Sequence, residues 1–209
     1  KTMITVLVIA MSMASLASAQ VVLWDQTEGY ESWSMGFFNN IAGGPPFGST
    51  TYTCNDIVVP EGGWDINTVK VYFDGFNPGW AGGVVEAVLY IEPKEGSLPM
   101  GDPSTGATVP VVTTLLGNGF LEVAAMGLSE ELTSGEYWIG LTPITPNSDN
   151  IHVSVVAVGD DSPSYDAFGF PEPMWMGWAP GLDGAMLIEG EAAVANDAAT
   201  LGQVKSLYR

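Results

Sequence analysis

The feature that most constrains this sequence is an apolar residue at every second position, in short runs separated by glycine and proline. In residues 66–73, for example, Val69, Val71 and Phe73 alternate with Lys70 and Tyr72. A period of two places successive side chains on opposite faces of a strand, whereas a helix needs a period near 3.6. The pattern therefore predicts half-buried β-strands rather than helices.

Other runs have the same strand-like character and end at turn residues. They are residues 21–24, 52–59, 84–92, 120–125, 136–142, 151–159 and 185–189. Residues 95–110 contain few apolar side chains, so we expect a long connection there. Several short strands at this spacing predict an all-β fold, an antiparallel two-sheet sandwich of jelly-roll-like form, with a short C-terminal tail.

The first 19 residues have the three parts of a secretory signal peptide. A positive Lys1 precedes an apolar run at 4–16, and the small-x-small sequence ASA at 17–19 provides a cleavage site. The apolar run is shorter than the ~20 residues of a transmembrane helix. We therefore expect a signal peptide at 1–19, a β-sandwich domain at 20–190 and a linker and tail at 191–209. The mature protein is then secreted or held at the cell surface, with no membrane span.

The charge of the chain limits its partners. The formal net charge is −19, and removal of residues 1–19 takes away one charged residue, Lys1, which leaves −20. An acidic surface repels phosphate backbones, so we expect no nucleic-acid binding. The chain is nevertheless 46% hydrophobic, which is enough for a real core and argues against disorder. Its length fits one domain.

Two segments carry recognisable patterns: DIVVP at 56–60 followed by GWDI at 63–66, and LTSGEYWIGL at 132–141. They resemble the "DDF-x-V-P", "G-x-W-x-I" and "L-x-x-G-x-Y-W-[IV]" patterns of secreted bacterial jelly-roll domains of unassigned function. The resemblance covers roughly residues 50–142 and departs at Cys54-Asn55, where an acidic or small residue is commoner. It implies a jelly-roll fold and no particular activity.

The C-terminal residues 197–209 resemble the "W-G-x-[IV]-K-x-L-[YF]-R" endings of some secreted bacterial proteins, with Leu201 where tryptophan is usual. Leu201, Val204, Leu207 and Tyr208 would share one side of a short helix. Such a helix is marginal alone in water, so it would gain order by docking. We expect a tail that attaches or sorts the protein through an export or anchoring factor. The alternative is a frayed terminus.

No catalytic motif is present: there is no G-x-S-x-G elbow, no H-E-x-x-H and no glycine-rich phosphate loop. The single histidine, His152, is expected on a sheet face. The lone Cys54 cannot form an internal disulfide and is expected to be a small buried apolar residue. We therefore expect a non-catalytic binding or structural module. The alternative is a carbohydrate-active enzyme, a glycoside hydrolase or lyase, because hydrolysis of a glycosidic bond needs only two carboxylates.

Three tryptophans, Trp80, Trp175 and Trp178, lie in segments rich in proline and glycine. An exposed indole is a flat apolar platform on which a sugar ring can stack, so these residues are the candidate ligand-binding residues for a glycan. Alternatively, they fold back and cover the ends of the sandwich. The other tryptophans are expected in the core or on a sheet face: Trp24, Trp33, Trp64 and Trp138.

A calcium site is the one cofactor that the sequence suggests. Calcium prefers several oxygen ligands, and Asp160, Asp161 and Asp166 could converge in one loop. A solvated acidic loop is the alternative.

Overall fold

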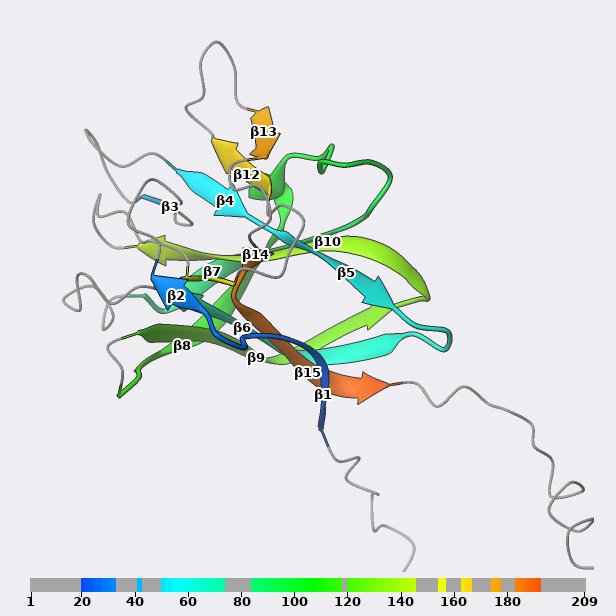
Figure 1. The fold of residues 1–209 in the computed structure, drawn as a ribbon, viewed down its shortest axis with the longest axis horizontal. Helices are drawn as coiled ribbons and strands as arrows, with labels where there is room; N and C mark the ends of the chain where they lie inside the picture. Colours follow the sequence, from blue (N-terminus) through cyan, green and yellow to red (C-terminus); the bar gives the residue numbers. More distant parts are fainter. Residues whose placement is uncertain are drawn as a thin grey trace, which may run out of the picture.

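The computed structural model describes residues 20–32, 41–42, 50–73, 84–117, 120–145, 154–156, 163–166, 174–177 and 183–192. Within these ranges every regular element is a strand, except for one turn of 3-10 helix, η2 (Pro103–Thr105) (Figure 1). The predicted signal peptide at 1–19 lies outside the described residues, as does the tail beyond Ala192.

Nine strands form the main sheet, and their pairings are antiparallel except for that of the two-residue β3 (Ile41–Ala42). The other eight are β1 (Val21–Gln26), β5 (Asn55–Val59), β6 (Trp64–Phe73), β7 (Glu86–Pro93), β8 (Ala107–Leu115), β9 (Leu121–Leu132), β10 (Gly135–Thr145) and β15 (Met186–Ala192). The strand order is β1-β15-β6-β9-β8-β7-β10, and both β5 and β3 pair with β10.

Strand β8 joins two layers of this sheet. Residues 107–110 pair with β7, and residues 111–115 pair with β9. The first layer contains β1, β15, β6 and β9, the second contains β7, β10 and β5, and β8 turns the corner between them. The chain visits the layers alternately, as the interleaved strands of a jelly roll do.

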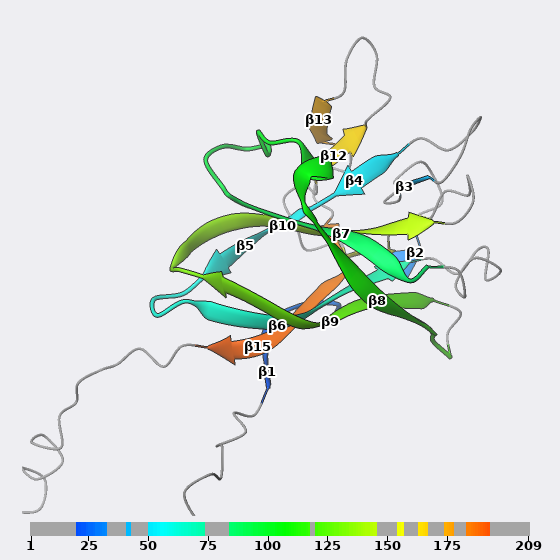
Figure 2. The ribbon, with the colours of Figure 1, turned by 180° about the vertical axis from the view of Figure 1, so that it is seen from behind.

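The prediction of an all-β, antiparallel fold is confirmed. Because β8 pairs with both neighbours, the two layers are one continuous sheet that nearly closes on itself (Figures 1 and 2). The two-sheet form of the sandwich stays a prediction.

The core fills the space between the layers. It is built from the inward-facing side chains of strands in both layers, and they are almost completely excluded from solvent. The largest fully buried side chains among them are Ile57, Ile66, Phe73, Leu121, Ile139, Leu141, Met186 and Ile188. Burial of each contributes roughly 1.5–3 kcal/mol relative to exposure. The predicted alternation of Val69, Val71 and Phe73 toward one face is confirmed.

A glycine turn carries the chain from the second layer to the first. Between β5 and β6, Gly62 and Gly63 have φ values of 104° and 88°, a region that other residues rarely adopt. The Gly63 amide donates to the Pro60 carbonyl at 3.1 Å. A Cβ on Gly63 would lie 2.4 Å from the carbonyl oxygen of Leu132, so this position also has no room for a side chain.

Two three-stranded sheets accompany the main one. The first consists of β14 (Asp183–Gly184), β11 (Ser154–Val156) and β2 (Glu31–Ser32), and the second consists of β13 (Met174–Gly177), β12 (Pro163–Asp166) and β4 (Thr51–Thr53). Strands β12 and β13 stand at the top of Figure 1, on the side of the second layer. The first and last strands of the main sheet pair with each other at the opposite side.

Three details differ from the predicted strands. The run 52–59 is divided at Cys54 into β4 and β5. Residues 107–110, expected in a connection, belong to β8, and Pro110 lies where that strand changes partner, a place that tolerates a missing N–H. Val85, within the predicted strand 84–92, is 62% exposed and precedes β7, which begins only at Glu86.

Candidate functional site

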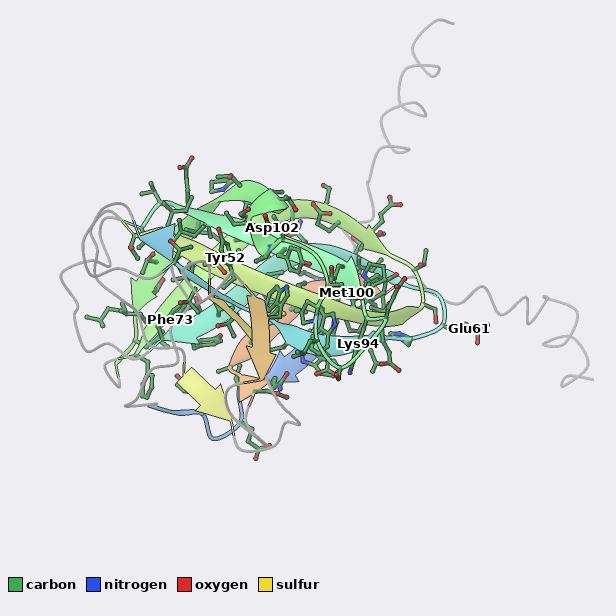
Figure 3. All side chains as sticks on the ribbon, turned by 90° about the horizontal axis from the view of Figure 1, so that it is seen from above. Tyr52, Glu61, Phe73, Lys94, Met100 and Asp102 are labelled. Carbon is green, nitrogen blue, oxygen red and sulfur yellow. The ribbon has the colours of Figure 1, made fainter. Side chains whose placement is uncertain are left out.

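The connection between β7 and β8, residues 94–106, folds back over the outer face of the second layer, and we call it the strap. In Figure 1 it arches above β5 and β10, beside β12 and β13. Figure 3 looks onto this face and labels Lys94, Met100 and Asp102 of the strap. The site described below lies where the strap meets the sheet and β13.

The carboxylate of Glu92, at the end of β7, holds the strap in place. Its Oε1 accepts a hydrogen bond from the Met100 amide at 2.7 Å, and its Oε2 accepts one from the Gly101 amide at 3.0 Å. The hydroxyl of Tyr90 donates to the same Oε2 at 2.5 Å. Hydrogen bonds to a charged acceptor are stronger than neutral ones, so this carboxylate fixes the backbone of the strap.

Tyr90 and Gly101, which both donate hydrogen bonds to Glu92 Oε2, are each suited to this contact. Tyr90 is buried, which raises the pKa of its hydroxyl far above the usual value, and the hydrogen bond to Glu92 and its charge raise it further. The hydroxyl therefore stays protonated and remains a donor. A Cβ on Gly101 would lie 2.6 Å from the Tyr90 hydroxyl and 2.7 Å from Glu92 Oε2, so only glycine allows this approach.

Trp175, one of the three predicted platform residues, is attached to this arrangement. Its indole Nε1 donates to the carbonyl of Gly101 at 2.8 Å, and its ring lies 5.8 Å from that of Tyr90, tilted by 32°. The side chain is half-buried. It lies in strand β13, opposite Tyr165, and not in the loop-like setting that its sequence neighbours suggested. Gly101 is thus bonded to Glu92 on one side and to Trp175 on the other.

A second group of side chains lies at the start of the strap. The Lys94 ammonium forms an ion pair with Asp56 at 2.5 Å and lies 3.8 Å from Glu136. It also stands 4.9 Å from the centroid of the Trp138 ring, within the range of a cation–π interaction. Both Lys94 and Asp56 are largely buried, so solvent screens this pair less than an exposed one.

The remaining described tryptophans agree with the sequence interpretation. Trp64 belongs to the core, Trp24 packs against it, and Trp138 is buried on the outer face of the second layer. The Nε1 of Trp138 is buried without a hydrogen-bond partner within the described residues. Trp33, Trp80 and Trp178 lie outside the described residues.

Cys54 lies between β4 and β5 and is 1% exposed, which confirms the prediction of a small buried residue. Burial raises the pKa of its thiol well above the usual value, and the charges of Glu92 and Asp56 raise it further. The thiolate is the reactive form of cysteine, so this environment suppresses nucleophilic chemistry. The single histidine, His152, lies outside the described residues.

The predicted calcium ligands are divided by the structure. Asp160 and Asp161 lie outside the described residues, and Asp166 is in strand β12, paired with Thr51 and Met174. Within the described ranges, no group of three or more histidine, cysteine, aspartate or glutamate side chains could hold a metal ion. The calcium site stays a prediction.

Two further surface features lie on the first layer. A hollow of ≈280 Å³ is lined by residues of β6, β9 and β15, among them the carboxylates of Asp65, Glu131 and Glu191. Elsewhere, the ring of Tyr30 stacks on Tyr72 at 5.4 Å and meets the edge of Phe120 at 4.8 Å.

Sequence reasoning missed the residues that hold Trp175. Tyr90 and Glu92 lie in the predicted strand 84–92, on the face opposite to the core residues Ala87 and Leu89. Glu92 accepts hydrogen bonds from the backbone amides of Met100 and Gly101, which have no sequence signature. These two residues were predicted only to belong to a long connection.

Comparison with protein-family models, with curated proteins and with solved structures finds no match to this chain. Nor does the described part of the chain contain a helix that is both long enough and apolar enough to cross a membrane. The function of this site must therefore be inferred from its geometry alone.

Proposed function

We propose that this chain is a secreted or cell-surface binding module without catalytic activity, and that its ligand is a glycan that stacks on Trp175. The observation that carries the proposal is that Trp175 is fixed in orientation yet only half-buried. A stacking platform needs both properties. The ring must be held so that little conformational entropy is lost on binding, and part of it must stay accessible.

Two contacts fix the orientation of Trp175. The hydrogen bond to Gly101 sets the direction of the indole N–H, and the Tyr90 ring supports the indole from the sheet. The strap that carries Gly101 is in turn held by Glu92. A platform supported in this way is preorganised, which lowers the cost of binding.

The alternative function is a carbohydrate-active enzyme, and it requires two carboxylates free to act on one glycosidic bond. Two of the carboxylates at the strap, those of Glu92 and Asp56, are already engaged. Glu92 accepts three hydrogen bonds, and Asp56 pairs with Lys94. This engagement favours a binding role over hydrolysis for this site.

The proposed location and the predicted export or anchoring partner depend on residues 1–19 and 197–209. Their sequence resembles a signal peptide and a sorting tail, and both ideas are tested together. The full-length chain and a chain truncated after Ala192 are expressed, and each is located in cells or medium. Release of the truncated protein into the medium supports attachment through the tail, whereas an unchanged location argues against it.

The glycan proposal is tested with a glycan array followed by calorimetric titration of the best ligand. Trp175→Ala should lower its affinity on the order of tenfold, because the stacking surface is lost. Trp175→Phe keeps a ring and should lose less. The matched control is Tyr30→Ala, which removes a partly buried ring from the first layer and should leave affinity unchanged.

Three results would decide between the functions. Binding that depends on Trp175 but not on Tyr30 supports the module. Release of shorter sugars from the bound oligosaccharide would establish the enzyme instead. If no glycan binds, or if the two variants behave alike, Trp175 is a structural residue and the glycan proposal is wrong.

A further inference from the structure

The surroundings of Trp175 carry information about the chemical class of its ligand. Met100 precedes the glycine that binds the indole, and its side chain is 77% exposed although its amide is fixed by Glu92. An exposed apolar side chain adds contact area for a ligand, and its backbone, already fixed, needs no further ordering on binding. Trp175 is hydrogen-bonded to Gly101, and Met100 is its neighbour in the chain, so each adds an apolar surface next to this glycine.

The charged groups around these apolar surfaces are negative. The Glu92 carboxylate accepts a hydrogen bond from the Gly101 amide, and Asp102, the next residue after Gly101, is exposed. Asp102 is also held in place, because its Oδ1 accepts hydrogen bonds from the amide and hydroxyl of Ser104 at 2.9 and 2.6 Å. Glu95 is exposed at the start of the strap. An anionic ligand would approach several carboxylates at close range.

The one cation in the sequence of the strap is already neutralised. Lys94 forms its ion pair with Asp56, lies close to Glu136 and stands over the Trp138 ring. Using it for a ligand carboxylate or sulfate would break a largely buried pair and leave Asp56 without its counterion, which is costly. Beyond the strap, the net charge of −19 adds long-range repulsion of anions.

We infer that the glycan bound at Trp175 and Met100 is uncharged, and that glycans carrying carboxylates or sulfates are excluded. This inference rests on the proposed function. It follows from like-charge repulsion around the platform, since juxtaposed like charges strongly disfavour a wrong partner. Hydroxyl groups of a neutral sugar, by contrast, can donate hydrogen bonds to the exposed carboxylate of Asp102.

The test uses pairs of hexasaccharides that differ only in charge. Hexamers of glucose, mannose, galactose and N-acetylglucosamine are each titrated beside a counterpart with its C6 hydroxyls oxidised to carboxylates. At least one neutral hexamer should bind at least about tenfold more tightly than its oxidised counterpart. Its affinity should be the same at about 50 mM and about 500 mM salt, whereas any residual affinity for the oxidised hexamer should rise with salt.

Substitutions locate the effect at the strap. Met100→Ala should weaken binding of the neutral hexamer severalfold, and the control Met126→Ala, a comparably solvent-exposed methionine on the first layer, should not. Asp102→Asn keeps the oxygen that caps η2 but removes a charge, so it should narrow the difference between the paired hexamers. Glu131→Gln removes an exposed charge from the first layer and should leave that difference unchanged.

The outcomes separate the inference from the proposal beneath it. If oxidised hexamers bind as tightly as neutral ones, and Trp175→Ala abolishes both, the glycan module stands and the inference of a neutral ligand is wrong. Equal effects of Asp102→Asn and Glu131→Gln would also overturn it. If no member of any pair binds, the proposed function fails, and the inference fails with it.

Discussion

The side-chain amide of Asn55 pairs with the backbone of Gly184 as a peptide group in a neighbouring strand would. Its Nδ2 donates to the Gly184 carbonyl at 2.8 Å, and its Oδ1 accepts from the Gly184 amide at 3.0 Å. Asn55 begins β5 in the main sheet, and Gly184 ends β14 in one of the three-stranded sheets, shortly before β15 begins. This buried pair therefore ties together two sheets through residues that are 129 positions apart along the chain.

Asn55→Asp should destabilise the protein by about 2 kcal/mol at neutral pH, because a buried carboxylate cannot donate to the Gly184 carbonyl. Burial would raise the pKa of the new carboxyl in the folded state above its unfolded value of about 4. The variant should therefore be least impaired below about pH 4 and lose stability as the pH rises. Urea unfolding at several pH values measures this. Asn67→Asp, at an exposed position, is the control; equal losses in the two variants would refute the role of the pair.

Gly101→Ala should disturb the strap more than the sheet. The added Cβ would meet the Tyr90 hydroxyl and Glu92 Oε2 below 3 Å, so either these two side chains or the strap must shift, and the hydrogen bonds between them are disturbed. We expect a shifted indole N–H signal of Trp175 in NMR spectra and a loss of glycan affinity, with a small change in thermal midpoint. Gly96→Ala lies in the same strap and meets nothing closer than 3.8 Å. Gly96→Ala should leave the indole N–H signal of Trp175 unchanged. An identical shift of this signal in both variants would contradict the proposed geometry.

Lys94→Met should cost more stability than Lys70→Met. Both lysines form an ion pair, Lys70 with Glu189 at 3.0 Å, and the pairs have similar exposure. Within the described residues, Lys94 also lies near the exposed Glu136, a pair worth little, and stands over an aromatic ring, which adds on the order of 0.5–2 kcal/mol when partly desolvated. Chemical denaturation of both variants gives the two free energies of unfolding. If their losses are the same, the contact with Trp138 contributes nothing measurable.

Alkaline pH should destabilise the fold through two tyrosines. Burial raises the pKa of both Tyr72 and Tyr90 well above the unfolded value of about 10, and each hydroxyl also donates to a glutamate. The folded protein therefore binds these protons more tightly than the unfolded chain does. Its stability should be complete below about pH 10 and fall as the pH rises above that value. The double variant Tyr72→Phe, Tyr90→Phe should show a shallower fall between about pH 10 and about pH 11; an unchanged slope would rule out this coupling.

The alternating runs predicted the main strands because burial of one sheet face requires an apolar residue at every second position of a strand. Residues 66–73 and 84–92 show this well, since their inward side chains are those of the core. The sequence of strand β8 shows this alternation less clearly. Most of its side chains remain exposed or partly exposed, so nothing required apolar residues at 107–110.

The candidate site was only partly predictable, for a different physical reason. Trp175 was found because a large aromatic side chain between prolines and glycines is unusual. Its support depends on the carboxylate of Glu92 receiving backbone amides from the strap, and every residue except proline has such an amide. The Asn55 pair with Gly184 is of the same kind. In the sequence, Asn55 stands out only as a departure from the pattern of similar domains.

The pairing of β1 with β15 determines where the two ends of the described domain lie relative to the strap. Val21 lies opposite Gly190, so the ends of the described domain emerge together, on the side away from the strap (Figures 1 and 2). A molecule tethered through the segment after Ala192 would hold Trp175 and Met100 toward its surroundings, and its own support would not obstruct them. The same adjacency of the ends means that copies joined head to tail by short linkers could stand side by side with all their straps facing outward.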